Sequence, residues 1–352
     1  MSKDDIRAAV AAGILDEAQA AKMLALADER AGRRAAEENE PFEFFKGFAE
    51  IFVSVGLVLL IAATMGFAAL FGGWLILPAI LVATSWGLAT YFTKQKRMTL
   101  PSIVLASGFA LGVLGMAGKA TLDMGDLFDG LLSDTLFAGG LGMAAMAAYY
   151  RVFRVPFAMF LLGLFGFWTV LAITGSLSGP AYGGSFADRL FDLHRGSGYA
   201  FGTLVFGLLA FAGAMWFDLR DPHRLGRTAA SGFWLHLLAA PALINTLLLT
   251  FLNVGGDLGY LLTAAGIGLV AVFALVIDRR SFLTAGMIYL GVLLLWAMSA
   301  GGRDVSWPML LLVLGGLITA LGTFWTPLRA RLMRALPDFP GKSRLPPYSE
   351  AP

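Results

Sequence analysis

Long stretches without a charged residue constrain the fold of this chain more than any other feature. No Lys, Arg, Asp or Glu occurs between Ile51 and Thr93, and similar stretches recur as far as Leu328. Of the 352 residues, 58% are hydrophobic and 14% are charged. An average soluble domain has about 25% charged residues. Because this composition cannot cover a water-facing surface, we predict an all-α, polytopic integral membrane protein.

The charge-free stretches predict about ten transmembrane helices. A helix needs about 20 apolar residues to cross a hydrocarbon core roughly 30 Å thick. Gly72-Gly73 divides the first stretch into two spans. The predicted spans cover 51–71, 74–92, 98–118, 131–150, 155–175, 196–217, 228–256, 258–277, 281–302 and 305–328.

The distribution of basic residues predicts the orientation of these spans. Lys and Arg accumulate on the cytoplasmic side of membrane proteins. With the N-terminus inside, 22 of the 26 basic residues fall on the inner side, and four fall on the outer side, namely Lys119, Arg189, Arg195 and Arg303. We therefore predict a multi-pass protein with both termini in the cytoplasm and the lipid bilayer as its main partner.

Residues 1–40 are charged and Ala-rich, and they predict a cytoplasmic helical hairpin ahead of a transmembrane domain over 41–328. Gly13 ends the first helix, and Asp16 with Gln19 three positions later resembles a capping box that begins the second. The second helix is predicted to run toward Ala36. Helix propensity alone explains such a hairpin, and recruitment of a cytoplasmic protein partner is the alternative.

The C-terminal residues 329–352 predict an arm followed by a tail. Thr326–Ala335 alternates apolar residues with Arg329, Arg331 and Arg334, which favours a short amphipathic helix on anionic lipid. Five prolines follow from Pro337 onward, and we predict that 337–352 is disordered.

Catalytic and cofactor-binding motifs are absent or degraded. The chain has no Cys and three His, which excludes thiolate metal sites and argues against an imidazole site. Gly118-Lys119-Ala120-Thr121 resembles a P-loop fragment, but Val113 stands where a Gly is required. The glycines of 140–145 and 266–271 lie within spans, where they favour close helix packing. We predict no enzyme, no cofactor, no metal and no nucleic-acid partner.

Four polar residues are the candidate solute or structural contacts. His236 and Asn245 lie in the seventh span, and nine residues separate them, about 13 Å along a helix. Lys119, at the outer end of the third span, can snorkel or pair with Asp123. Asp126 belongs to the acidic outer loops, where attraction of a cation competes with simple solubility.

Interhelical hydrogen bonding explains His236 and Asn245 equally well, and contact with a solute is the alternative. No predicted membrane core contains Asp, Glu, Lys or Arg, which argues against an ion-coupled transporter. The outer loops around 126–129 and 188–192 share a Leu-Phe-Asp core and predict short helices on the membrane surface.

The run Gly13-Ile14-Leu15-Asp16-Glu17-Ala18-Gln19-Ala20, followed by a charged helix and a Phe-rich entry into the first span, resembles the domain-of-unknown-function 2157 family of bacterial predicted membrane proteins. Gly112–Asp126 is similar to a glycine-rich family segment, although Lys119-Ala120-Thr121 departs from the family's Gln-containing pattern. The resemblance implies a bacterial inner-membrane protein and no defined activity.

Two functions remain open from the sequence. The first is non-enzymatic binding or transport of a small or amphiphilic solute, which a central polar cavity reaching Asn245 would favour and a purely apolar packed interior would oppose. The second is a membrane scaffold that recruits a cytoplasmic partner through residues 1–40. The homo-oligomeric state stays unknown.

Overall fold

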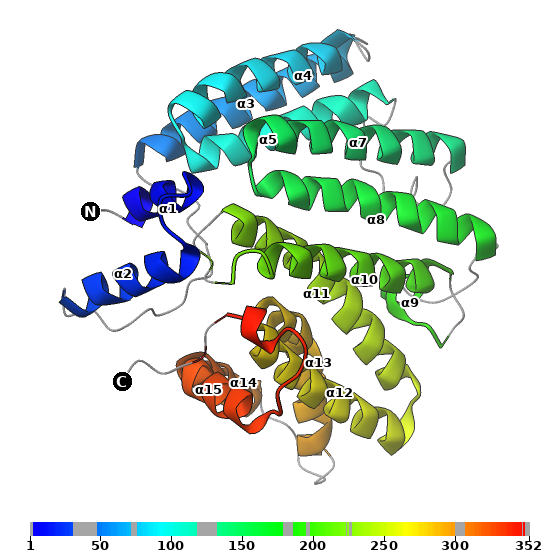
Figure 1. The fold of residues 1–352 in the computed structure, drawn as a ribbon. Coiled ribbons are helices and arrows are strands. Elements are labelled where there is room, and N and C mark those ends of the chain that lie inside the picture. Colours follow the sequence, from blue (N-terminus) through cyan, green and yellow to red (C-terminus); the bar gives the residue numbers. More distant parts are fainter. Residues whose placement is uncertain are drawn as a thin grey trace. The chain divides into compact units, whose positions relative to one another are not determined.

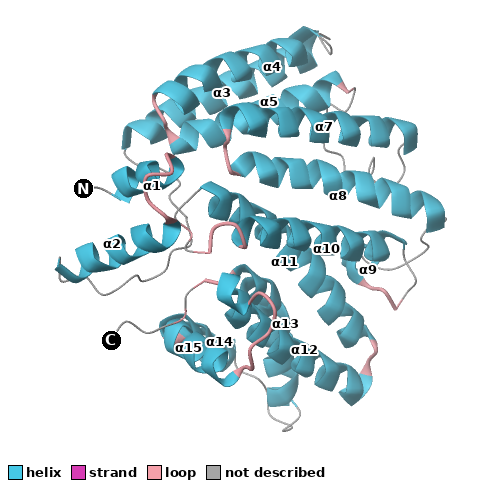
Figure 2. Ribbon diagram, viewed as in Figure 1, coloured by secondary structure: helices cyan, strands magenta, loops and turns pink. Residues whose placement is uncertain are grey.

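The chain folds entirely into helices and connecting turns in the part that its computed structural model describes (Figure 2). The described residues are 3–30, 48–71, 76–117, 132–178, 186–194, 198–222, 224, 227–299, 307–346 and 348. They contain no strand. The chain divides into two compact units, of which unit 1 comprises 1–39, 182–232 and 239–352, and unit 2 comprises 40–181 and 233–238.

Unit 2 is a bundle of apolar helices around α5 (Figure 1). Its helices are α3 (Phe48–Phe71), α4 (Ile76–Ala89) with its π-helical continuation η1 (Thr90–Gln95), α5 (Thr99–Met116), α7 (Leu132–Phe153) and α8 (Phe157–Ser178). Gly112 of α5 permits the approach of α4, because a Cβ at this position would lie 2.9 Å from the Pro78 carbonyl oxygen. The core of unit 2 therefore lies around the small residues of α5.

Unit 1 contains the helices from both ends of the chain (Figure 1). They are α1 (Lys3–Ala11), α2 (Glu17–Arg30), α9 (Phe186–Phe191), α10 (Gly198–Asp218), α11 (Arg227–Asn253), α12 (Gly256–Ile277), α13 (Ser281–Ser299), α14 (Trp307–Thr323), α15 (Trp325–Ala335) and the short 3₁₀-helix η2 (Lys342–Arg344). Residues 233–238 of α11 cluster with unit 2. The core of unit 1 is formed by apolar residues of α11, α12 and α13.

Eight of the described helices are long and apolar enough to cross a membrane, namely α3, α4 with η1, α5, α7, α8, α10, α11 and α12. The chain is therefore a multi-pass membrane protein. The number rises to nine if the bent pair α14–α15 counts as one span. Helix α13 runs over Ser281–Ser299 and is not among these eight. Nine of the predicted spans correspond to one helical segment each, and the tenth, 305–328, is divided between α14 and the start of α15. The count of ten spans and the orientation stay predictions.

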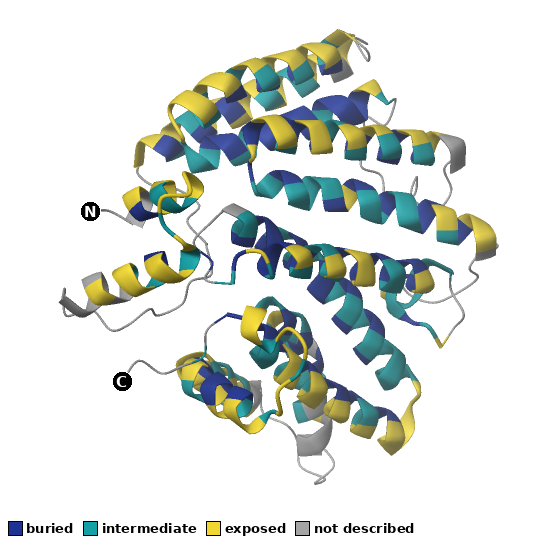
Figure 3. Cartoon of the chain, in the orientation of Figure 1, coloured by how far each residue is buried: buried dark blue, intermediate teal, exposed yellow. Residues whose placement is uncertain are grey.

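Many residues of these helices are exposed (Figure 3), and a large number of the exposed side chains are apolar. Among the α3 side chains whose burial is described, Glu50, Ser54 and Leu57 are buried, whereas apolar side chains such as Phe52 and Leu60 are exposed. Exposed apolar surface of this extent is not compatible with water and is stable in lipid.

The N-terminal hairpin has the predicted local structure. Gly13 follows α1 with a positive φ of 72°, which glycine adopts without steric cost. The Asp16 backbone N–H donates to Gln19 Oε1 at 3.2 Å. This is the half of the predicted capping box in which the N3 side chain reaches back to the N-cap backbone. Ile6 and Ala20 are buried between the two helices. The structure thus contains two packed helices here, while their cytoplasmic location stays a prediction and the predicted extension toward Ala36 falls outside the described residues.

The C-terminal arm differs from the prediction in two respects. Helix α15 forms as expected and meets α14 at an angle of 66°, with Pro327 in its first turn, where proline is tolerated. However, Arg329 is buried instead of facing lipid, and Arg331 and Arg334 are the exposed arginines. The chain beyond Pro337 contains η2 where we expected a disordered tail.

Candidate functional site

The four polar residues predicted from the sequence do not form one site. His236 is fully buried on α11. Asn245 is half-buried on the same helix, and its backbone carbonyl accepts a hydrogen bond from the Tyr289 hydroxyl at 3.4 Å. Lys119 and Asp126 lie outside the described residues. His236 and Asn245 therefore occupy separate positions on α11, and neither lines the pocket described below.

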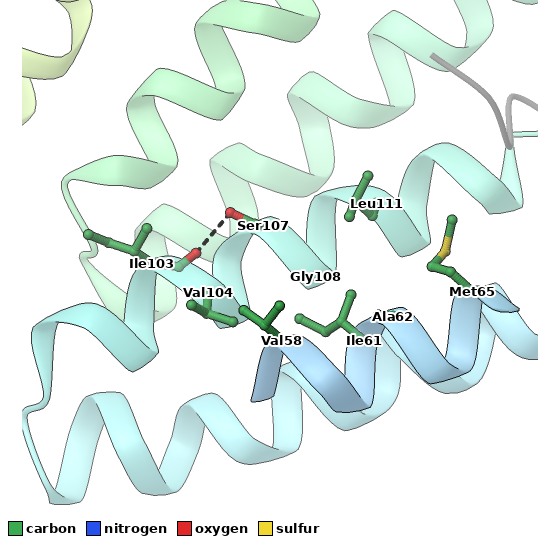
Figure 4. A pocket seen from close by; sticks show the side chains of 9 residues that line it. All are labelled: Val58, Ile61, Ala62, Met65, Ile103, Val104, Ser107, Gly108 and Leu111. Atoms are coloured by element: carbon green, nitrogen blue, oxygen red, sulfur yellow. Dashed lines mark hydrogen bonds between the residues drawn. The ribbon is translucent and has the colours of Figure 1, made fainter. Parts of the chain in front are cut away.

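A cavity of about 370 Å³ lies between α3 and α5 in unit 2 (Figure 4). We call it the α3–α5 groove. It is lined from α3 by Val58, Ile61, Ala62 and Met65, and from α5 by Ile103, Val104, Ser107, Gly108 and Leu111. None of these residues was singled out from the sequence, because a groove depends on the distance between helices that are far apart in the chain.

Gly108 sets the shape of the groove floor. A Cβ on this glycine would lie 2.7 Å from Ile61 Cδ1 and 2.9 Å from the Ser85 hydroxyl oxygen. Both distances are shorter than those between a Cβ and a neighbouring non-hydrogen atom in proteins. The glycine therefore lets α3 and α4 pack against the same turn of α5. It also leaves the surface above its own backbone without a side chain.

The groove offers a ligand apolar contacts alone. Ser107 carries its one side-chain hydroxyl, and this group already donates to the Ile103 carbonyl at 3.0 Å (Figure 4). A back-bonded serine of this kind presents little polarity to a neighbour. The volume lies at the lower end of the range of about 300–1,000 Å³ found for small-molecule sites. The groove therefore suits a hydrocarbon chain better than a polar solute.

A second cluster, in unit 1, consists of buried ionic groups. Arg279 has no solvent exposure, and its Nε and Nη2 donate to the two carboxylate oxygens of Asp218 at 3.0 and 2.5 Å. Arg279 Nη2 also donates to the Ala229 carbonyl at 3.3 Å. This bidentate pair joins the end of α10, the start of α11 and the α12–α13 turn.

Asp278, next along the chain, is the centre of the other ion pairs. Its carboxylate lies 3.1 Å from Arg224 Nη1, accepts from Trp325 Nε1 at 2.8 Å, and lies 3.6 Å from Arg329 Nε. Arg329 also donates to the Leu275 carbonyl at 3.0 Å, and so satisfies a carbonyl at the end of α12. We call Asp218, Arg224, Asp278, Arg279, Trp325 and Arg329 the ion-pair network.

The ion-pair network was missed in the sequence. Its arginines were interpreted as an orientation signal of inner loops, and a loop arginine gives no sign of whether it is buried. Asp218 and Arg279 are 61 residues apart, so no spacing rule relates them. The network binds groups of the chain itself, and its arrangement is that of a structural clamp.

The α9 segment forms the predicted short helix and packs against α11, while its position on the membrane surface stays a prediction. Asp192 is fully buried and accepts from Asn253 Nδ2 at 2.8 Å. The Leu193 N–H donates to Thr250 Oγ1 at 3.0 Å, which ties the segment to α11. Within the described ranges, no three His, Cys, Asp or Glu residues lie close enough together to hold a metal ion.

We compared the chain with known protein families, with curated proteins and with solved structures, and none of them matches. The resemblance to the domain-of-unknown-function 2157 family therefore stays a prediction.

Proposed function

We propose that this chain is a bacterial inner-membrane protein that binds an amphiphile, inserting the hydrocarbon chain of its ligand into the α3–α5 groove without catalysing a reaction. The proposal includes ten spans with both termini in the cytoplasm. The observation that carries it is the apolar groove of about 370 Å³ between two membrane-spanning helices.

The character of the groove favours an amphiphile over a polar solute. Its lining contains no charged residue, and neither His236 nor Asn245 belongs to it. A polar solute would lose its hydrogen bonds to water there without replacement, which is costly. A hydrocarbon chain has no such bonds to lose, and it reaches an open apolar groove directly from the surrounding bilayer.

Photo-crosslinking with a fatty acid that carries a diazirine on its chain tests the proposal. The protein is purified, placed in lipid nanodiscs, labelled and digested, and the labelled peptides are identified by mass spectrometry. We expect label on 58–65 of α3 and 103–111 of α5, in excess over the other exposed apolar helix faces.

A variant that fills the groove supplies the control. Ala62→Phe places a ring in the groove from α3, and we expect it to abolish the labelling of α5. The neighbouring Ala63 is exposed on the same helix and does not line the groove, so Ala63→Phe should leave the labelling unchanged. Uniform labelling of all exposed helices in wild type and both variants would argue against a specific site.

A second function, that of a scaffold, is favoured by the surface of the N-terminal hairpin. Ile14 and Leu26 are 75% and 50% exposed, although the hairpin lies outside the predicted spans. Apolar side chains of this size in water often mark a protein contact. Deletion of 1–40 separates the two functions: a scaffold would lose its partner while groove labelling persists, whereas an amphiphile-binding protein would keep its labelling and its phenotype.

A further inference from the structure

Two turns at one end of unit 2 carry a cluster of exposed basic side chains. The turn between η1 and α5 and the turn between α7 and α8 lie at the same end of this unit (Figure 1). Lys94 and Phe153 connect them, because the Lys94 ammonium lies 5.2 Å from the centre of the Phe153 ring. We call these five residues the basic turn cluster: Lys94, Lys96, Arg97, Arg151 and Arg154.

Among the described residues of unit 2, the basic turn cluster has no balancing carboxylate. The acidic residues described there are Asp134, in the first turn of α7 and so at its other end, and Glu50, which is buried at the start of α3. The Glu50 carboxylate accepts the Thr99 and Leu100 backbone N–H groups, both at 3.1 Å, and so caps the start of α5. The charge of Glu50 is therefore directed at the helix terminus, and five exposed cations remain to attract an anion.

Two of these arginines lie in left-handed backbone at helix C-termini. Arg97 follows η1 and Arg154 follows α7, and both have a φ of 52°. Glycine adopts this conformation freely, whereas a residue with a Cβ adopts it at a cost. A glycine at either position would therefore remove the charge without straining the turn.

The basic turn cluster lies at the near end of the α3–α5 groove. Helix α5 begins at Thr99, two residues after Arg97, and Ile103 is the first α5 residue that lines the groove. Four residues of helix correspond to about 6 Å. An amphiphile whose chain occupies the groove from this end would therefore place its headgroup near Arg97.

We infer that the amphiphile is an anionic phospholipid, with its chain in the α3–α5 groove and its phosphate held by the basic turn cluster. This inference rests on the proposed function and adds the class of headgroup. The predicted orientation agrees with it, because both turns fall on the cytoplasmic side, where the membrane surface is negatively charged.

Competition between headgroups tests the inference. The full-length protein is placed in nanodiscs that contain equal amounts of phosphatidylglycerol and phosphatidylcholine, each in turn with a diazirine on its acyl chain. We expect the groove peptides 58–65 and 103–111 to be labelled preferentially by phosphatidylglycerol. Replacement of cluster residues should lower this preference about fivefold for each charge removed.

The glycine variants separate charge from backbone structure. Arg97→Gly and Arg154→Gly remove a charge each and suit the left-handed turns, so we expect the double variant to stay folded while its headgroup preference falls. The double variant Arg331→Gln, Arg334→Gln removes the same charge from two exposed positions of α15 and should leave the preference unchanged.

Three outcomes would overturn the inference. Equal groove labelling by both lipids would show that the headgroup is not recognised, although the chain is bound. An unchanged preference in the Arg97→Gly, Arg154→Gly variant would exclude the cluster. Displacement of phosphatidylglycerol by excess inorganic phosphate would show a free-anion site instead. Failure of the proposed function is a different result, namely no groove labelling by any lipid.

Discussion

The Arg279 guanidinium and the Asp218 carboxylate form a bidentate ion pair inside unit 1, with 0% and 6% of the two side chains exposed. The pair joins α10 to the α12–α13 turn across 61 residues of sequence. Two opposite charges in such a place compensate each other's lost hydration only while both are present. This gives the first prediction about stability.

Removal of one partner of this pair should be much more costly than removal of both. Arg279→Met or Asp218→Leu leaves a buried charge uncompensated, and we expect each to destabilise the protein by about 3–5 kcal/mol. The double variant should recover most of this loss. Thermal unfolding of wild type, the two single variants and the double variant in the same detergent measures these losses. Additive losses of stability would contradict a coupled buried pair.

The second prediction concerns the anchoring of α15 at Asp278. Trp325→Phe keeps the ring and removes the indole N–H that donates to Asp278 Oδ1 at 2.8 Å. Loss of this hydrogen bond should cost about 1–3 kcal/mol, because its acceptor is charged. Trp216 is 50% exposed, so Trp216→Phe is the matched control and should be nearly neutral. Equal effects of the two substitutions in thermal unfolding would refute the anchoring role.

The third prediction concerns the packing of α4 on α5. Gly112→Ala places its new Cβ 2.9 Å from the Pro78 carbonyl oxygen and 3.0 Å from the Val82 backbone nitrogen, and overpacking against backbone atoms should destabilise by about 1–3 kcal/mol. Gly87 of α4 has open space around its Cβ position. Gly87→Ala should therefore be neutral or stabilising by up to about 1 kcal/mol, since alanine favours helices. A neutral Gly112→Ala would mean that α4 does not pack closely on α5.

The fourth prediction concerns the effect of pH on the N-terminal hairpin. Burial raises the pKa of the Glu17 carboxyl above its ordinary value of 4.5, and the negative charges of Asp221 and Asp16 raise this pKa further. The folded hairpin thus binds a proton more readily than the unfolded one. Its stability is lowest above the raised pKa and increases as the pH falls toward 4.5.

Hydrogen exchange of the α1 and α2 amides measures this effect. After correction for intrinsic exchange rates, protection should increase from neutral to mildly acidic pH in wild type. Glu17→Gln should show higher protection at neutral pH and a weaker dependence on pH. Identical pH profiles for wild type and Glu17→Gln would show that another group is responsible.

Local features of the fold were predictable from the sequence because they depend on residues that are near in the chain. The Gly13 helix end, the Asp16–Gln19 capping interaction and the positions of the apolar helices belong to this class. Glycines within spans were also predicted as packing contacts. Gly142 and Gly266 agree with this, because a Cβ there would meet Phe165 and Leu248, whereas Gly140 and Gly268 have open space at the Cβ position and do not.

The candidate sites were not predictable for the opposite reason. The groove depends on the separation of α3 and α5, and the ion-pair network depends on which loop arginines turn inward. His236 was predicted as a candidate contact because it is a polar residue within a span. It does not line the groove. Glu50, which directly precedes the first predicted span and was not singled out, caps a helix that begins 49 residues later.

The most direct test of amphiphile binding is an electron-density map of the full-length protein in nanodiscs of mixed bacterial phospholipids. The account predicts an elongated density between α3 and α5, beside Ala62 and Gly108, in wild type and in Ala63→Phe. It predicts that this density is absent in Ala62→Phe. A groove that is empty in wild type, or closed by movement of α3 onto α5, would contradict it.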